Sequence, residues 1–145
     1  MKIAIASDHG GYELKKQLVP YLEKRGLTVC DMGCDSNDSV DYPDYAFPLA
    51  EAVARGEHDF GILICGTGIG VSMCANRVPG IRCALCSEPV SAKLTRQHNN
   101  ANVLAMGARM IGFEMACAIV DAFLATEFEG GRHSRRVDKV TGYNK

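Results

Sequence analysis

The stretch Gly61-Ile62-Leu63-Ile64-Cys65-Gly66-Thr67-Gly68-Ile69-Gly70 decides the fold of this chain. An apolar run typical of a buried strand ends on a cysteine, and a glycine-rich turn and a predicted helix follow. Such a turn leaves backbone N–H groups free at the positive end of a helix, which favours binding of an anion. A thiol held there is expected to be biased toward the thiolate. Considered by itself, the turn fits a cysteine that is merely buried in the core equally well.

Three common glycine-rich or cysteine-containing motifs do not fit this turn. A dinucleotide fingerprint needs glycine at its sixth position, which is Val71 when counted from Gly66. A P-loop needs a lysine that the turn lacks, and a Cys-x5-Arg phosphatase needs arginine where Val71 stands. The turn therefore indicates another kind of anion site.

The composition predicts one domain, residues 1–145, in which residues 130–145 are a basic C-terminal tail with a flexible start. A hydrophobic share of 47% excludes disorder, and a net charge of −1 argues against nucleic-acid or membrane partners. The start of the chain resembles a strand more than a signal peptide, and no apolar run approaches the length of a membrane span. Seven cysteines are an odd set, so we expect free thiols in a reducing cytoplasm.

A metal site is not expected, although Cys83 and Cys86 form a C-x-x-C pair and Cys30 and Cys34 are four apart. The C-x-x-C pair lies in a predicted buried strand, where residues three apart face opposite sides of the sheet. Structural zinc sites instead use cysteines in turns.

Strand and helix patterns alternate along the chain. They predict a doubly wound, Rossmann-like α/β fold of three layers with a five-stranded parallel sheet. Pro20 is expected to kink the first helix, and the broad apolar face of the last one suits either a dimer interface or an ordinary core helix. The predicted strands are 2–6, 27–31, 60–65, 81–86 and 102–106, and the predicted helices are 11–25, 44–55, 70–78, 88–98 and 112–125.

Polar residues gather where the predicted strands end. In such folds ligands bind beyond the carboxyl ends of the strands, which are followed here by Asp8 and His9, by residues 65–70 and by residues 107–109. Residues 98–100 precede the fifth strand, so they reach this edge only from another chain or through a long loop.

Two arginines of the tail, Arg132 and Arg136, are four apart and share a face if the tail is helical. Two guanidinium groups on one side match a phosphate, although a solvated basic tail explains them as well. A thiol, an oxyanion cradle, histidines and phosphate-binding arginines together indicate proton abstraction next to a carbonyl. Aldose–ketose isomerisation of a sugar phosphate through an enediolate is such a reaction, and it needs no metal or other cofactor.

The sequence resembles ribose-5-phosphate isomerase type B and its relatives that isomerise galactose 6-phosphate and allose 6-phosphate. The resemblance extends nearly from end to end. It rests on Ser7-Asp8-His9-Gly10-Gly11, Asp41-Tyr42-Pro43, Cys65 to Gly70, Cys86-Ser87-Glu88, Arg96-Gln97-His98-Asn99, Asn102-Val103-Leu104 and Glu129-Gly130-Gly131-Arg132-His133.

This resemblance implies roles for individual residues. Cys65 is the base that moves the proton, and valine at position 71 places the chain in the branch that uses a thiol. His98 assists ring opening, with Thr67 nearby. The implied substrate-binding residues are Asp8, His9, Gly66, Gly68, Ile69, Gly70, Asn99, Arg109, Arg132 and Arg136, partly contributed by the second subunit of a homodimer or dimer of dimers.

Three alternatives to ribose 5-phosphate isomerisation remain at this point. One is isomerisation of a 6-phosphohexose, because the sequence does not fix the length of the sugar. Another is a nucleotide-sensing α/β domain that uses the same turn to hold phosphates. The third is thiol-based hydrolysis, which requires a covalent intermediate.

Overall fold

The computed structural model describes residues 1–143, so the last two residues of the predicted tail lie outside the described part. Within it, β1 is Lys2–Ser7, β2 Thr28–Asp31, β3 Phe60–Cys65, β4 Cys83–Leu85 and β5 Val103–Gly107. A short 3-10 helix, η1, covers His9–Gly11. The α-helices are α1 Tyr12–Lys24, α2 Pro43–Ala54, α3 Ile69–Ala75, α4 Pro89–Asn99, α5 Phe113–Leu124 and α6 Arg132–Thr141.

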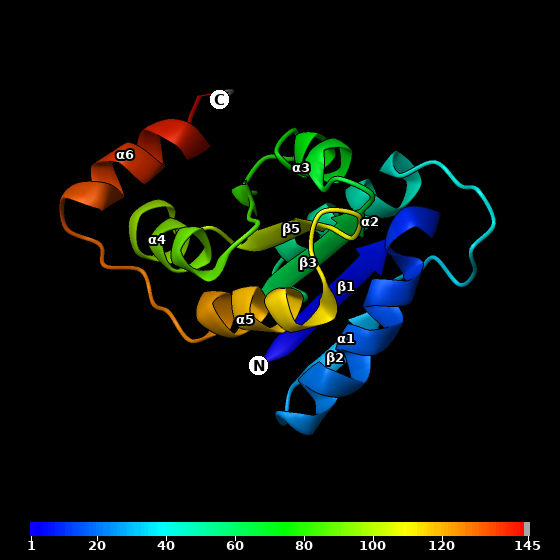
Figure 1. Cartoon of the computed structure of the whole chain (residues 1–145). Helices are drawn as coiled ribbons and strands as arrows, with labels where there is room; N and C mark the ends of the chain where they lie inside the picture. Colours follow the sequence, from blue (N-terminus) through cyan, green and yellow to red (C-terminus); the bar gives the residue numbers. More distant parts are fainter. Residues whose placement is uncertain (144–145) are drawn as a thin grey trace.

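The strands form one parallel sheet in the order β2-β1-β3-β5-β4 (Figure 1). This confirms the predicted α/β fold and its five strands. Because β3 is central, Cys65 at its end lies in the middle of the carboxyl edge, paired with Gly107 of β5. The thiol turn is thus placed where such folds bind ligands.

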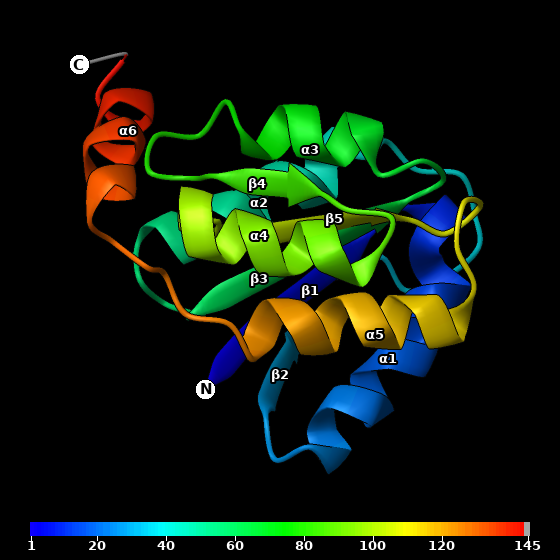
Figure 2. The ribbon, with the colours of Figure 1, turned by 60° about the vertical axis from the view of Figure 1, so that its left-hand side comes forward.

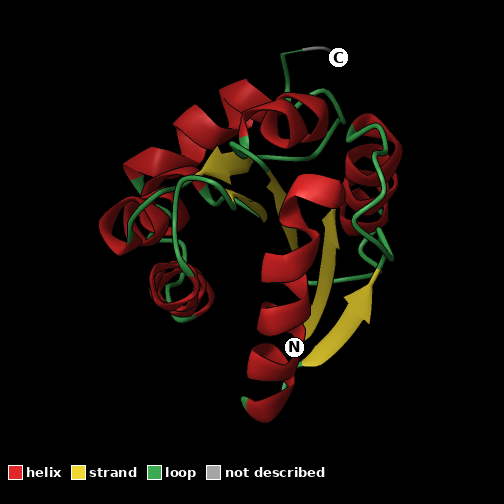
Figure 3. Cartoon of the chain, turned by 45° about the vertical axis from the view of Figure 1, so that its right-hand side comes forward, coloured by secondary structure: helices red, strands yellow, loops and turns green. Residues whose placement is uncertain are grey.

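Helices cover both faces of the sheet (Figures 2 and 3). Leucines of α1 pack on one face with α5 and Ala92 of α4, while α2 and α3 pack on the other. The broad apolar face of α5 is explained within one chain, since Ala116, Ile119, Val120 and Phe123 are fully buried. Its breadth therefore supports the core-helix interpretation.

One predicted strand needs correction. The fourth strand is three residues long rather than the predicted 81–86. Pro20 lies inside α1, as predicted, and the helix continues past it to Lys24. The N-cap of α4 is Glu88, the first residue of the predicted helix 88–98, and its carboxylate accepts the N–H groups of Val90 and Ser91. A side-chain hydrogen bond with Ser91, together with these backbone bonds, lowers the pKa of Glu88.

The predicted basic tail is mostly helix. Gly130 and Gly131 adopt positive φ angles of 69° and 56°, and α6 begins directly after them. The helix lies beside α4, at the end of the molecule away from η1 (Figure 2). Arg132 and Arg136 therefore lie on one helix, which is the condition under which their spacing puts them on a shared face.

The cysteines of the C-x-x-C pair lie on opposite faces of the sheet, as predicted. Cys83 packs with the α2 and α3 side, and Cys86 belongs to the cluster on the other side. Burial raises the pKa of Cys83 to about 12 and that of Cys86 to about 11. All seven cysteines are free thiols. Among the described residues, no helix combines the length and apolar character that crossing a bilayer requires.

Candidate active site

The thiol turn holds the Cys65 sulfur close to backbone N–H groups. Cys65 is 6% exposed, and the N–H of Gly68 donates to its Sγ at 3.1 Å. The Cys65 carbonyl accepts from the N–H of Ala108 at 2.8 Å, which ties the turn to the end of β5. A backbone donor aimed at the sulfur stabilises negative charge on it, so the geometry suits a thiolate.

Two glycines make this turn possible. Gly68 has a φ of 78°, a left-handed conformation that costs other L-residues free energy. A Cβ at Gly68 would lie 2.8 Å from the carbonyl carbon of Met106. A Cβ at Gly107 would lie 2.6 Å from the carbonyl group of Thr67. The turn and the end of β5 can approach this closely because neither position has a side chain.

Three N–H groups of the turn remain free to bind a ligand. The N–H of Gly68 is directed at Cys65, and that of Ile69 donates to the Thr67 hydroxyl at 3.2 Å. Those of Gly66, Thr67 and Gly70 have no acceptor within residues 1–143. Adjacent free N–H groups form an anion-binding concavity.

Asp8 and His9 lie beside this turn, as predicted. The Asp8 carboxylate accepts the N–H of Gly10 at 2.9 Å and so begins η1. Gly10 packs against the turn, since a Cβ there would lie 3.1 Å from the nitrogen of Gly66. The N–H of Val40 donates to Nδ1 of His9 at 3.1 Å. This bond leaves the proton of a neutral imidazole on Nε2.

Two further side chains close over the turn. The aliphatic and guanidinium atoms of Arg109 lie 3.4 Å from where a Cβ on Gly66 would stand. The backbone N–H of Arg109 donates to the Gly66 carbonyl at 3.0 Å. The ring of Tyr42 lies 2.7 Å from where Gly70 would carry a Cβ. Sequence reasoning quoted Tyr42 in a motif but gave it no role. Its contact depends on a loop between distant elements.

The remaining predicted residues form a second group, at the C-terminal end of α4 and on α6. The rings of His98 and His133 stack at 4.5 Å with an angle of 18°. His98, Asn99, His133 and Arg136 line a cavity of about 900 Å³ between β4, α4 and α6. Burial and the nearby His98 and Arg132 lower the pKa of His133, which sequence reasoning had not singled out.

Arg82 fixes the end of α4 that carries this second group. Its Nε donates to the carbonyl groups of Asn99 and Asn100 at 3.1 and 2.9 Å. Another guanidinium nitrogen donates to the Thr141 hydroxyl of α6 at 3.2 Å. A cationic side chain thus satisfies carbonyl groups at a helix C-terminus and links the two helices.

His98, Glu129 and His133 also bring potential metal ligands within 4.8 Å of one another. The two histidine rings lie face to face, so the nitrogen lone pairs in their planes run side by side instead of converging. A cation would require both rings to turn. The arrangement therefore indicates a stacked histidine pair rather than a preformed metal centre.

The two groups of residues lie at opposite ends of the strands (Figure 2). Cys65 is level with the last residue of β5, whereas Asn99 ends the helix that leads into its first residue. Five residues of strand span about 13 Å. A second, smaller pocket lined by Thr67 shares Leu85 and Cys86 with the large cavity. The two pockets therefore contact the same residues at the end of the edge strand β4.

Comparison with known proteins agrees with this fold. A profile of the Ribose/Galactose Isomerase family matches residues 3–140, so the chain belongs to this family. It is an aldose–ketose isomerase of the sugar-phosphate class. It is 54% identical over 140 residues to ribose-5-phosphate isomerase B of Escherichia coli strain K12, covering 97% of this chain and 94% of that protein.

Solved structures give the same result. Ribose-5-phosphate isomerase B of Clostridium thermocellum superimposes with a TM-score of 0.98 at 53% identity, covering 99% of this chain and 97% of that one. The enzyme of Mycoplasma genitalium with bound ribulose 5-phosphate gives a TM-score of 0.95 at 46% identity, covering 99% of this chain and 95% of that one.

Proposed function

We propose that this chain interconverts ribose 5-phosphate and ribulose 5-phosphate, with Cys65 as the base. The observation that carries the proposal is the thiol turn, in which a nearly buried sulfur lies beside unpaired backbone N–H groups. The relatives named ribose-5-phosphate isomerase, one of them with ribulose 5-phosphate bound, support the substrate.

In the proposed reaction, the Cys65 thiolate removes the proton from C2 of the open-chain aldose and returns it to C1. Negative charge then develops on the oxygen of an enediolate. We assign the free N–H groups of Gly66, Thr67 and Gly70 to bind this oxygen, because preorganised donors of this kind stabilise such charge strongly. The N–H of Gly68 keeps the sulfur in place.

We assign roles to the other predicted residues around the Cys65 sulfur and the enediolate oxygen. Asp8 holds sugar hydroxyls, and His9 donates from Nε2 to the phosphate. Arg132 and Arg136 complete the phosphate site, and Arg109 and Asn99 bind the sugar. His98 acts as the acid that opens the furanose ring, near Thr67. These roles follow the family resemblance and the grouping of the side chains.

The proposed assembly is a homodimer, alone or as half of a tetramer, with active sites shared between two chains. Cys65 and His98 lie at opposite ends of the strands, so one chain alone does not bring them together. Exposed apolar side chains line the large cavity beside β4, with Leu85 43%, Leu94 41% and Val140 65% exposed. A second copy seated there covers this surface and supplies the missing group.

Activity toward sugar phosphates tests the proposal. Purified protein should convert ribose 5-phosphate to ribulose 5-phosphate without added metal. Cys65→Ala should lower kcat by about 10²- to 10⁴-fold with an unchanged circular dichroism spectrum, because a positioned general base contributes a factor of this size. Cys74→Ala, which changes another buried thiol, should stay active. Near-normal turnover by Cys65→Ala contradicts the assignment of the base.

The same assay decides the length of the sugar. We expect a higher kcat/KM for ribose 5-phosphate than for allose 6-phosphate, and the reverse order contradicts the proposed substrate. Seven free thiols support a reducing compartment, which we take to be the cytoplasm.

A further inference from the structure

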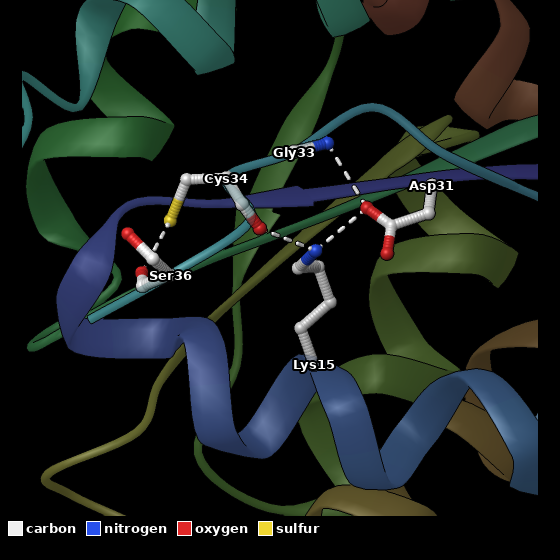
Figure 4. Close-up of polar contacts among 5 residues, drawn as sticks. All are labelled: Lys15, Asp31, Gly33, Cys34 and Ser36. Carbon is white, nitrogen blue, oxygen red and sulfur yellow. Dashed lines mark hydrogen bonds and ion pairs between the residues drawn. The ribbon is translucent and has the colours of Figure 1, made fainter. Parts of the chain in front are cut away.

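Lys15 is buried on the inner side of α1, where it takes no part in the proposed chemistry. Its side chain is 1% exposed, an unusual position for lysine unless the ammonium is paired. The Nζ donates to Oδ1 of Asp31 at 2.6 Å and to the Cys34 carbonyl at 2.8 Å (Figure 4). The ring of Tyr12 lies 5.5 Å away. The ammonium is therefore bound to the segment that follows β2.

The partners of Lys15 are in turn tied to the end of β1. The same Asp31 oxygen accepts the N–H of Gly33 at 2.9 Å. The Gly33 carbonyl accepts from the N–H of Ser7 at 2.8 Å, and the N–H of Cys34 donates to the Ser7 carbonyl at 2.9 Å. Ser7 immediately precedes Asp8. Lys15 thus holds residues 33–34 against the strand that leads into the site.

The rest of this loop, residues 35–42, forms a strap along the carboxyl edge of the sheet. Asn37 donates to the Glu13 carboxylate of α1 at 2.9 Å. Further along, the N–H of Val40 donates to Nδ1 of His9, and the Tyr42 ring packs against Gly70 of the thiol turn. The strap therefore makes two contacts that orient groups of the site.

We propose that Lys15 is a positioning residue for the phosphate-binding side of the active site. By fixing residues 33–34, its ammonium sets where the strap lies, and the strap holds His9 with Nε2 as the donor and Tyr42 over the turn. The inference rests on the proposed function, in which His9 binds the phosphate. The bonds of residues 33–34 are made to Ser7, next to Asp8 and His9, so Lys15 affects substrate binding more than proton transfer by Cys65.

The test compares Lys15→Met, which keeps the length of the side chain and removes its charge, with Lys16→Met. Lys16 is the matched control because its side chain is 55% exposed. In Lys15→Met we expect kcat/KM to fall about tenfold to a hundredfold through KM, with kcat within about twofold of the wild type. Hydrogen exchange should be faster in residues 33–42 and unchanged in β3 and β5. The Lys16 variant should match the wild type in both measurements.

The state of His9 provides a readout that does not depend on turnover. In the wild type, ¹⁵N NMR of the imidazole should show the proton on Nε2, whereas Lys15→Met should show a mixture of tautomers. Asp31→Ala removes one partner of Lys15, at a side chain that is 42% exposed. This variant should raise KM and mix the His9 tautomers, as Lys15→Met does. It tests the inference if Lys15→Met does not fold.

An unchanged KM and an unchanged His9 tautomer in a folded variant overturn the inference and leave the proposed function standing. Faster exchange throughout the sheet with equal losses in kcat and kcat/KM also overturns it, because that result marks a purely structural lysine. If the wild-type protein fails to isomerise ribose 5-phosphate, the proposed function fails, and exchange and NMR still decide whether Lys15 positions the strap.

Discussion

Replacing Gly68 by alanine should damage the thiol turn in two separable ways. The first is conformational, because a φ of 78° costs an L-residue about 1–2 kcal/mol. The second is steric, because the new Cβ would lie 2.5 Å from Leu85 and 2.8 Å from the carbonyl carbon of Met106. Leu85 can turn away, but Met106 is backbone of a buried strand. The turn must therefore shift, and the Gly68 N–H moves away from the Cys65 sulfur.

Gly26→Ala isolates the conformational part. Gly26 has a φ of 81°, and a Cβ there meets nothing within 4 Å. For this variant we expect Tm to fall by roughly 3–8 °C, from about 1–2 kcal/mol of strain, and kcat/KM to stay within about twofold of the wild type. Gly68→Ala should lose at least this much stability. Its kcat/KM should also fall about tenfold to a hundredfold, because a small displacement of reacting groups is costly.

Thermal melts and steady-state kinetics of both variants against wild-type protein measure these effects. Wild-type kcat/KM in Gly68→Ala refutes the argument that the turn geometry positions the thiol. Equal losses of activity in the two variants refute it too, since Gly26 lies between α1 and β2, far along the chain from the turn.

Two further predictions concern α6. Arg136→Ala should raise KM about tenfold or more, since a charge-assisted hydrogen bond contributes roughly 1.5–3 kcal/mol. Arg135→Ala, which changes the exposed neighbouring arginine, should leave KM unchanged in the same assay. An unchanged KM in both variants marks α6 as a solvated helix. Folding lowers the pKa of His133 below its ordinary value of 6.5, so protonation of this histidine opposes folding. The contribution of neutral His133 to folding stability is therefore full above pH 6.5 and is lost as the pH falls below that value. Tm should therefore drop less between pH 7.5 and 5 in His133→Gln than in the wild type, and parallel Tm curves contradict this.

The sequence predicted the parts of the molecule that depend on local patterns. Apolar runs and glycine punctuation placed all five strands, because short buried strands in a parallel sheet are nearly continuous apolar segments. The alternation of faces along a strand correctly separated Cys83 from Cys86. The apolar run that ends at Cys65 and the glycines after it also predicted that the thiol turn follows the end of a strand.

Features that depend on contacts between distant segments were missed. The Gly-Gly pair before Arg132 suggested a flexible start, whereas its two positive φ angles set a defined entry into α6. The contact of Tyr42 with Gly70 depends on where a long loop lies. One signal was available for Lys15, which is three residues before Leu18 on the apolar side of α1.

Mixing two inactive variants tests the central claim, a shared site with Cys65 from one chain and His98 from the other, most directly. Cys65→Ala and His98→Asn are each expected to be inactive. After unfolding together and refolding in equal amounts, half of the dimers should be mixed, and each of these should contain one intact site. The account predicts recovery of about a quarter of wild-type activity by this mass-action argument. A mixture that stays as inactive as its components, although size and mass show mixed dimers, contradicts it.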